Sequence, residues 1–496
     1  MSEHQTSYRQ IMKATSLFGG VQVFQIIISI IRSKFVAVLL GPSGMGIVGL
    51  LTSTTGFISA LTNFGLGTSA VKNISESNVT QNELRISTVI TVLRRLVWIT
   101  GILGAVLTLI LSSWLSQITF GNKNYTAAFV WISITLLFNQ LSSGQMVLLQ
   151  GLRKLQFLAK ANLYGSFVGL LITVPLYYKF GVNGIVPVII LTSLSALFFS
   201  WYFARKVRIR SLKVTKATTI AEGKDMLAMG FAISLSGLVT VASAYLLRIY
   251  ISRTGNVTDV GLYTAGFTII GTYVGMIFTA MGTDYYPRLA AVANDDKLCK
   301  QSMNQQAEIA VLILAPILIA FLVFINWAVI LLYSTQFIAV TGMIYWAALG
   351  MFFKAGSWAV AFVFLAKGAS RLYFWNELIG NCYTLVFNML GYYFYGLTGL
   401  GFSFLITYIF YLIQVYVIAK IKYNFSFDRS FLVLFFIQLT LALISFGAVQ
   451  FLNQPYPYIV GVILIIISGW YSLNELEKRI AMKQIIKDYF NQKKNK

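Results

Sequence analysis

Apolar runs of about twenty residues recur along the whole chain, and each can cross a hydrocarbon core of about 30 Å as a helix. Only 11% of the 496 residues are charged, against about a quarter in soluble proteins. The runs are continuous and do not alternate between apolar and polar residues, which excludes a β-barrel. The sequence therefore predicts an all-α polytopic membrane protein.

The runs and the turns between them predict fourteen helices joined by short connections, none long enough to form a folded domain. The predicted helices span residues 14–40, 44–70, 86–112, 125–149, 156–179, 183–206, 227–252, 258–283, 306–332, 336–365, 371–395, 399–420, 430–451 and 456–472.

The basic residues predict the orientation of these helices. With the N-terminus placed in the cytoplasm, 31 of the 38 lysines and arginines fall on the cytoplasmic side, and only Lys123, Lys179 and Arg253 fall outside. The positive-inside rule then predicts that both termini are cytoplasmic. The net charge of +23 is explained by topology and by affinity for anionic membrane lipids, so no nucleic-acid partner is needed.

The chain also repeats itself at a shift of 215 residues. At this shift Gly46 falls on Gly261, and the segment 177–184 (YYKFGVNG) falls on 392–399 (YYFYGLTG). Six helices in each copy make the repeat parallel, and such halves enclose a central cavity, as in alternating-access transporters. The predicted parts are an N-terminal lobe at 1–210, a basic linker at 211–226, a C-terminal lobe at 227–422, two extra helices at 423–472 and an amphipathic basic cytoplasmic tail at 473–496.

Four cations lie within the predicted membrane helices. Arg32 and Lys34 interrupt the apolar run 26–40, Arg248 falls near the equivalent place one repeat later, and Lys354 lies near the middle of its helix. An ionisable residue within the membrane is costly and is read first as functional. Four cations facing one cavity would bind a strongly anionic group such as a pyrophosphate. Snorkelling to the interface is the alternative for the first three, and structural pairing for Lys354.

The first of these helices stops at a turn that contains Gly41, Pro42 and Gly46. Proline cannot continue the helix, and glycine allows the chain to reverse, so these residues and the repeat-related Gly261 are predicted turn or hinge positions.

Acidic residues in the membrane segments are few. Asp284 and Glu377 are candidates to couple transport to a proton or sodium gradient, with ion pairing as the alternative for both. Glu308 is predicted to be a first-turn acid that stabilises a helix N-terminus. The one histidine, His4, and the two cysteines suggest neither a metal site nor a disulfide, and no cofactor is expected.

Four segments carry a family resemblance. They are the run 34–46 (KFVAVLLGPSGMG), the run 259–263 (DVGLY), the Phe353-Lys354 pair and the run 366–374 (AKGASRLYF). Their order and spacing resemble those of the Wzx-type flippases of O-antigen and enterobacterial common antigen.

The resemblance implies a fold similar to that of the multidrug and toxic compound extrusion exporters. It also implies that undecaprenyl-pyrophosphate-linked oligosaccharide moves from the cytoplasmic to the periplasmic leaflet of the bacterial inner membrane. By the local match, Lys34, Arg248 and Lys354 would bind the pyrophosphate, whereas Arg32 is included on the argument from its position. Membrane lipids are expected contacts, and binding to a polysaccharide polymerase or chain-length regulator is left open.

Two other classes of function remain open. A cation-coupled drug exporter of the same fold would be expected to place acids in its cavity, whereas the deep charges here are mainly cations. A membrane polymerase, ligase or glycosyltransferase needs catalytic polar residues, commonly on a sizeable loop, and this chain offers short loops. The sequence therefore favours a non-enzymatic flippase.

Overall fold

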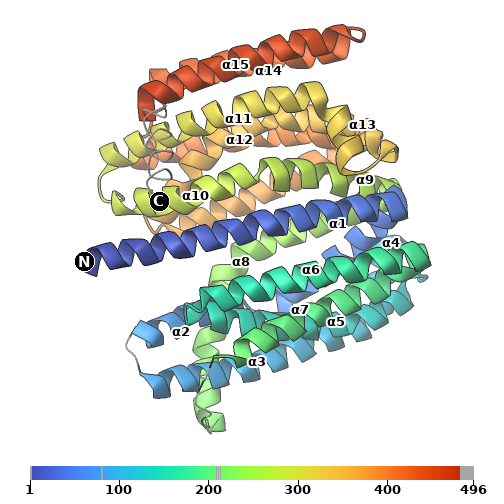
Figure 1. Ribbon diagram of the computed structural model, residues 1–496, viewed down its shortest axis with the longest axis vertical. Coiled ribbons are helices and arrows are strands. Elements are labelled where there is room, and N and C mark those ends of the chain that lie inside the picture. Colours follow the sequence, from blue (N-terminus) through green and yellow to red (C-terminus); the bar gives the residue numbers. More distant parts are fainter. Residues whose placement is uncertain (1–2, 80–81, 208, 210–211, 213, 481–496) are drawn as a thin grey trace, which may run out of the picture. The chain divides into compact units, whose positions relative to one another are not determined.

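The computed structural model describes residues 3–79, 82–207, 209, 212 and 214–480, most of which are helical and none of which lies in a strand. This confirms the predicted all-α class (Figure 1). The first eight α-helices are α1 (Glu3–Thr62), α2 (Leu66–Val79), α3 (Glu83–Ile110), α4 (Ser112–Phe120), α5 (Thr126–Gly151), α6 (Leu155–Phe180), α7 (Ile185–Arg205) and α8 (Lys216–Thr254), with a short 3-10 helix, η1 (Gly181–Gly184), between α6 and α7.

The remaining elements include a π-helix, η2, and a 3-10 helix, η3. They are α9 (Val257–Phe267), η2 (Thr268–Val274), α10 (Met276–Ala291), α11 (Asp296–Leu332), η3 (Thr335–Val340), α12 (Thr341–Ala366), α13 (Ser370–Tyr423), α14 (Arg429–Phe451) and α15 (Tyr456–Ile480).

Eleven stretches of the described residues are long and apolar enough to cross a membrane. Three of them, Phe24–Thr62, Leu155–Arg205 and Ser370–Tyr423, are too long for one crossing. Each is interrupted by a glycine with positive φ: Gly41 at 66°, Gly181 at 54° and Gly396 at 56°. Dividing each of the three stretches in two at its glycine turns the eleven stretches into fourteen segments, which is the predicted number. Glycine suits these positions because it adopts positive φ without a steric penalty.

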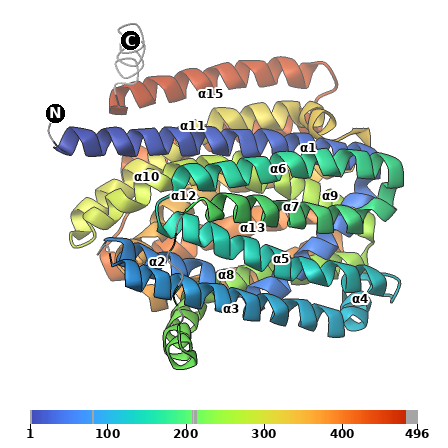
Figure 2. The ribbon, with the colours of Figure 1, turned by 60° about the horizontal axis from the view of Figure 1, so that its bottom comes forward.

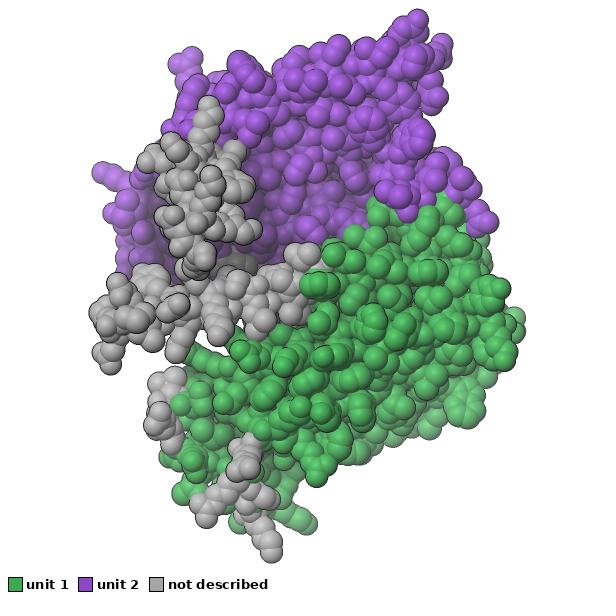
Figure 3. Space-filling view, in the orientation of Figure 1, with its two compact units in different colours: residues 1–261, 332–334 green, residues 262–331, 335–496 purple. Residues whose placement is uncertain are grey.

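The described residues form two compact units (Figure 3). Unit 1 comprises residues 1–261 and 332–334, and unit 2 comprises residues 262–331 and 335–496. Within unit 1, helices α5, α6 and α7 run side by side (Figure 2), and α8 packs against α1 and α2. The unit boundary thus follows α8, whereas the sequence repeat places a linker before it. The lobes inferred from the repeat remain a prediction.

Two glycines related by the repeat lie in a close backbone contact within unit 1. A Cβ atom on Gly46 would lie 1.9 Å from the Val257 carbonyl oxygen, and one on Gly261 would lie 1.8 Å from that of Pro42. Both distances are far below van der Waals contact, so only glycine fits at either position. The turn after Gly41 is therefore packed directly against the start of α9.

Unit 2 is organised around α12, whose residues are buried on several sides, among them Phe352, Ala355 and Phe364. The Tyr285 hydroxyl of α10 donates a hydrogen bond of 2.6 Å to the Ala359 carbonyl of α12. Near the end of α12, Lys367 pairs with Asp296 at the start of α11, with 2.7 Å between Nζ and Oδ1. These contacts fix α10, α11 and α12 relative to one another.

Several helices extend beyond their apolar parts. Helix α11 begins at Asp296, so Glu308 lies inside it, and the predicted first-turn role is wrong. Its carboxylate instead accepts a hydrogen bond of 2.7 Å from Arg479 Nε. Helix α15 continues to Ile480, so the first residues of the predicted tail prolong a membrane helix, and residues 481–496 lie outside the described part.

Candidate functional site

Lys354 lies close to the middle of α12 and is the cation around which the candidate site of unit 2 is arranged. Its side chain is half-buried. The ammonium nitrogen lies 5.6 Å from the ring centroid of Phe278 and 5.2 Å from that of Tyr408. Both distances are within the range of cation–π attraction, so aromatic faces partly compensate the charge.

None of the ion pairs found among the described residues involves Lys354, and its ammonium has no hydrogen-bond acceptor there. A membrane-embedded charge normally has a counter-charge or a polar partner. An ammonium that rests only on two rings retains its capacity to bind an anion.

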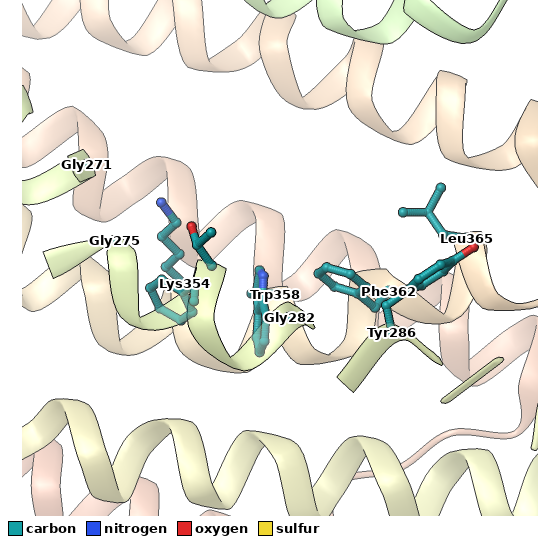
Figure 4. Close-up of a pocket in the computed structure, with 10 residues that line it drawn as sticks. Gly271, Gly275, Gly282, Tyr286, Lys354, Trp358, Phe362 and Leu365 are labelled. Carbon is teal, nitrogen blue, oxygen red and sulfur yellow. The ribbon is translucent and has the colours of Figure 1, made fainter. Parts of the chain in front are cut away.

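A cavity of about 650 Å³ lies beside this ammonium, between α12 and the η2–α10 segment (Figure 4). One wall carries Lys354, Trp358 and Phe362, which share a face of α12. Part of the facing wall, called the bare wall below, has no side chains because it carries glycines at 271, 275 and 282. The cavity is lined by Gly271, Gly275, Phe278, Thr279, Gly282, Tyr286, Lys354, Trp358, Phe362 and Leu365.

The bare wall includes the π-helix η2. The Gly275 amide donates to the Ile270 carbonyl oxygen at 3.1 Å, which is the i to i+5 spacing of a π turn. A Cβ on Gly275 would lie 2.0 Å from the Gly271 carbonyl oxygen, whereas a Cβ on Gly271 would meet no atom within 4 Å. Position 275 therefore requires glycine, because a side chain there would clash with the backbone. At position 271 the lack of a side chain leaves open space. Such π turns are frequent at functional sites.

The other predicted cations lie in unit 1. Arg32 and Lys34 are half-buried on α1, and Arg248 is half-buried on α8, where its guanidinium donates to the Ala244 carbonyl oxygen at 3.1 Å. The structure thus places three of the predicted cations in one unit and Lys354 in the other. That the four act on one ligand remains a prediction.

The two acids singled out in the sequence have different surroundings. Asp284 is exposed and lies 3.8 Å from Arg288 on the next turn of α10. Glu377, on α13, accepts a hydrogen bond of 2.6 Å from the Tyr411 hydroxyl and a longer one of 3.3 Å from Asn376 Nδ2. Gln414 completes the group by donating to Asn376 Oδ1 at 2.8 Å.

All polar partners of the Glu377 carboxylate seen among the described side chains are neutral. The sequence did not single out Tyr411 or Gln414, because their partners lie in a distant part of the same helix. The glycines of the bare wall did leave a signal, since positions 271, 275 and 282 repeat at helical spacing.

The fold and the site define a multi-pass helical membrane protein with an intramembrane cation in a pocket. Residues 35–341 match the family described as polysaccharide biosynthesis protein, and the chain belongs to this family. No curated protein matches it.

Two solved structures show the same fold. An inward-facing multidrug resistance transporter of the MATE family, from the MOP superfamily, is 16% identical over 81% of this chain and 94% of its own, with a TM-score of 0.68. The lipid II flippase MurJ, in an inward closed conformation, is 12% identical over 94% of this chain and 99% of its own, with a TM-score of 0.66. These likenesses confirm the MATE-like fold.

Proposed function

We propose that this protein is a flippase for lipid-linked oligosaccharides, and that its cavity binds their anionic linkage. The observation that carries the proposal is Lys354, a membrane-embedded ammonium that faces a cavity and has no carboxylate partner among the described residues. A cationic drug would be repelled by this charge, whereas a pyrophosphate would be attracted. The family, which is named for polysaccharide biosynthesis, supports a saccharide substrate.

The substrate we propose is undecaprenyl pyrophosphate carrying an O-antigen or common-antigen repeat unit. It moves from the cytoplasmic to the periplasmic leaflet of the bacterial inner membrane while both termini of the protein remain cytoplasmic. In the inward-open state the pyrophosphate binds Lys354 together with Arg32, Lys34 and Arg248, and the prenyl chain remains in lipid. Rearrangement of the two halves then exposes the site to the other leaflet by alternating access.

Glu377 is the better of the two candidates for coupling to a proton or sodium gradient. Its hydrogen bonds come from neutral groups, so the carboxylate can change its protonation or bind a cation without breaking a salt bridge. The exposed pair between Asp284 and Arg288 suits a structural or surface role instead.

The test is polysaccharide display in cells that lack the endogenous flippase. Lys354→Ala should abolish display while the protein still accumulates in the membrane, because the site loses its free positive charge. Lys123→Ala, which removes an exposed cation from a loop, should display normally. Normal display by Lys354→Ala at ordinary expression would overturn the assignment of the site.

A cation-coupled drug exporter is the second candidate, favoured by one observation: Glu377 is an acid within a membrane helix. In that case Glu377→Gln would abolish drug resistance, and Lys354→Ala would leave it intact. The two candidate functions thus predict opposite sensitivity at Lys354, whereas both predict a loss of transport in Glu377→Gln.

A further inference from the structure

The cavity beside Lys354 continues along two helices toward the cytoplasmic end predicted for them. Its residues on α12, from Lys354 to Leu365, cover about 16 Å along the helix axis, at 1.5 Å per residue. Figure 4 shows Lys354 near the Gly271 and Gly275 segment, Trp358 beside Gly282, and Phe362 near Tyr286. The cation thus lies toward one end, and aromatic rings line the rest.

The aromatic wall is held in place by its own contacts. The ring centroid of Trp358 lies 5.3 Å from that of Phe278 and 5.1 Å from that of Phe362. Opposite it, Gly282 leaves only enough room for the rings, since an added Cβ would lie 3.4 Å from Trp358 Cζ2. The wall is therefore preformed, and a ligand need not order it.

The bare wall contributes a main-chain hydrogen-bond acceptor, the carbonyl oxygen of Gly271. The Gly271 carbonyl oxygen lies where a side chain of residue 275 would begin. Gly271 and Gly275 both line the cavity and have no side chains of their own. A carbonyl oxygen has two lone pairs, so that of Gly271 can accept a bond from a ligand besides a bond within the helix. An apolar occupant such as a prenyl chain would bury the Lys354 ammonium without a polar partner, which is unfavourable.

These groups fit a ligand that combines a phosphate, hydroxyl groups and a ring with an apolar face. We propose that the cavity is the subsite for the sugar bonded directly to the pyrophosphate, and that Gly271 sets the size of sugar it accepts. The phosphate binds Lys354, a sugar hydroxyl donates to the Gly271 carbonyl, and the sugar ring lies against the aromatic wall. This inference rests on the flippase function and deepens it by naming the part of the substrate that unit 2 recognises.

The structure offers a matched set of glycine variants. A Cβ at Gly271 meets nothing within 4 Å, so Gly271→Ala fills a small part of the cavity without a clash, and Gly271→Val fills more of it. Gly447 on α14 also has nothing within 4 Å of an added Cβ and does not line the cavity, which makes Gly447→Val the control. Equal melting temperatures would show that all three variants fold.

The experiment measures binding of two probes to the purified full chain: undecaprenyl pyrophosphate, and the same lipid carrying one N-acetylglucosamine. Gly271→Val should weaken binding of the glycosylated probe at least about tenfold, because the side chain occupies the place of the sugar, and Gly271→Ala should weaken it less. Binding of the sugar-free probe should not change. Lys354→Met should weaken binding of both probes, and Gly447→Val should weaken binding of neither.

The outcomes separate the two proposals. If the wild type binds both probes, and Gly271→Val weakens binding of both equally or of neither, the proposed sugar subsite is ruled out and the flippase function stands. If the folded wild type binds neither probe, the flippase function fails, and the subsite fails with it.

Discussion

Two sets of charged residues in unit 2 differ in how they are compensated. Near the predicted cytoplasmic ends of the helices, Lys367 pairs with Asp296, and Arg479 pairs with both Glu308 and Glu475. Deeper in the helices, Lys354 contacts aromatic rings and Glu377 accepts hydrogen bonds from neutral groups.

The deep charges are opposite in sign, and yet they do not pair with each other. Between them lie the rings of Tyr408 and Tyr411, whose centroids are 6.3 Å apart. Tyr408 contacts the Lys354 ammonium, and Tyr411 donates to the Glu377 carboxylate. The paired charges therefore hold helices together, whereas the deep charges remain available to a ligand or an ion. Substitutions of the paired charges should accordingly change stability, and substitutions of the deep charges should change transport.

The largest effect on stability is expected at Arg479. Glu308 is 8% exposed, and Arg479 also donates to Ser430 Oγ at 2.8 Å. Arg479→Ala leaves this carboxylate buried without its partner and should destabilise the protein by about 3 kcal/mol. Thermal unfolding in detergent measures the loss. Adding Glu308→Gln should recover much of it, and a double variant as unstable as Arg479→Ala would contradict the pairing role.

Glu377→Gln should leave stability almost unchanged, because the amide oxygen still accepts the hydrogen bond from Tyr411. The transport rate should fall about tenfold, which corresponds to about 1.4 kcal/mol of activation free energy. Transport should also lose its response to an imposed proton or sodium gradient. Flux into proteoliposomes with and without each gradient measures both effects. A variant that still responds to the gradient would remove Glu377 from the coupling step.

Lys367→Met should produce the smallest effect, about 1 kcal/mol of stability, because its partner Asp296 is half-exposed. Burial of the Lys367 ammonium is the largest single influence and lowers its pKa, but the hydrogen bond with Asp296 and the electrostatic attraction of Asp296, Cys299 and Tyr423 together raise the pKa of Lys367 above its usual value. A raised pKa stabilises the folded state below the unfolded-state value of about 10.4, and this stabilisation is lost as the pH rises through the folded-state pKa.

Between about pH 6 and about pH 9 the difference in stability between Lys367→Met and the wild type should therefore be constant. Melting temperatures across this range measure it. A difference that vanishes already near neutral pH would show that the ion pair does not contribute as described.

The sequence predicted the number of membrane segments well, because hydropathy and the glycine turns mark each crossing. It predicted helix ends poorly where helices continue into water: α11 starts at Asp296 and α15 ends at Ile480, beyond the apolar residues. The π-helix left no hydropathy signal, since a π turn changes the hydrogen bonds and not the composition.

The candidate site was predicted only in part. A lysine in the middle of an apolar run is conspicuous, so Lys354 could be found from the sequence alone. Its aromatic neighbours and the Tyr411 and Gln414 partners of the Glu377 group could not. Their contacts join residues at least 34 positions apart in the sequence, and membrane helices contain many aromatic and amide side chains in unrelated roles.

The most direct test of the account is flux of an undecaprenyl-pyrophosphate oligosaccharide in proteoliposomes, followed by its accessibility in the outer leaflet. The wild type, Lys354→Met and Lys354→Arg would be compared at equal reconstitution. We expect transfer by the wild type, loss in Lys354→Met and partial transfer in Lys354→Arg, which keeps the charge but changes its geometry. Transfer by Lys354→Met at the wild-type rate would contradict the claim that this unpaired cation binds the substrate.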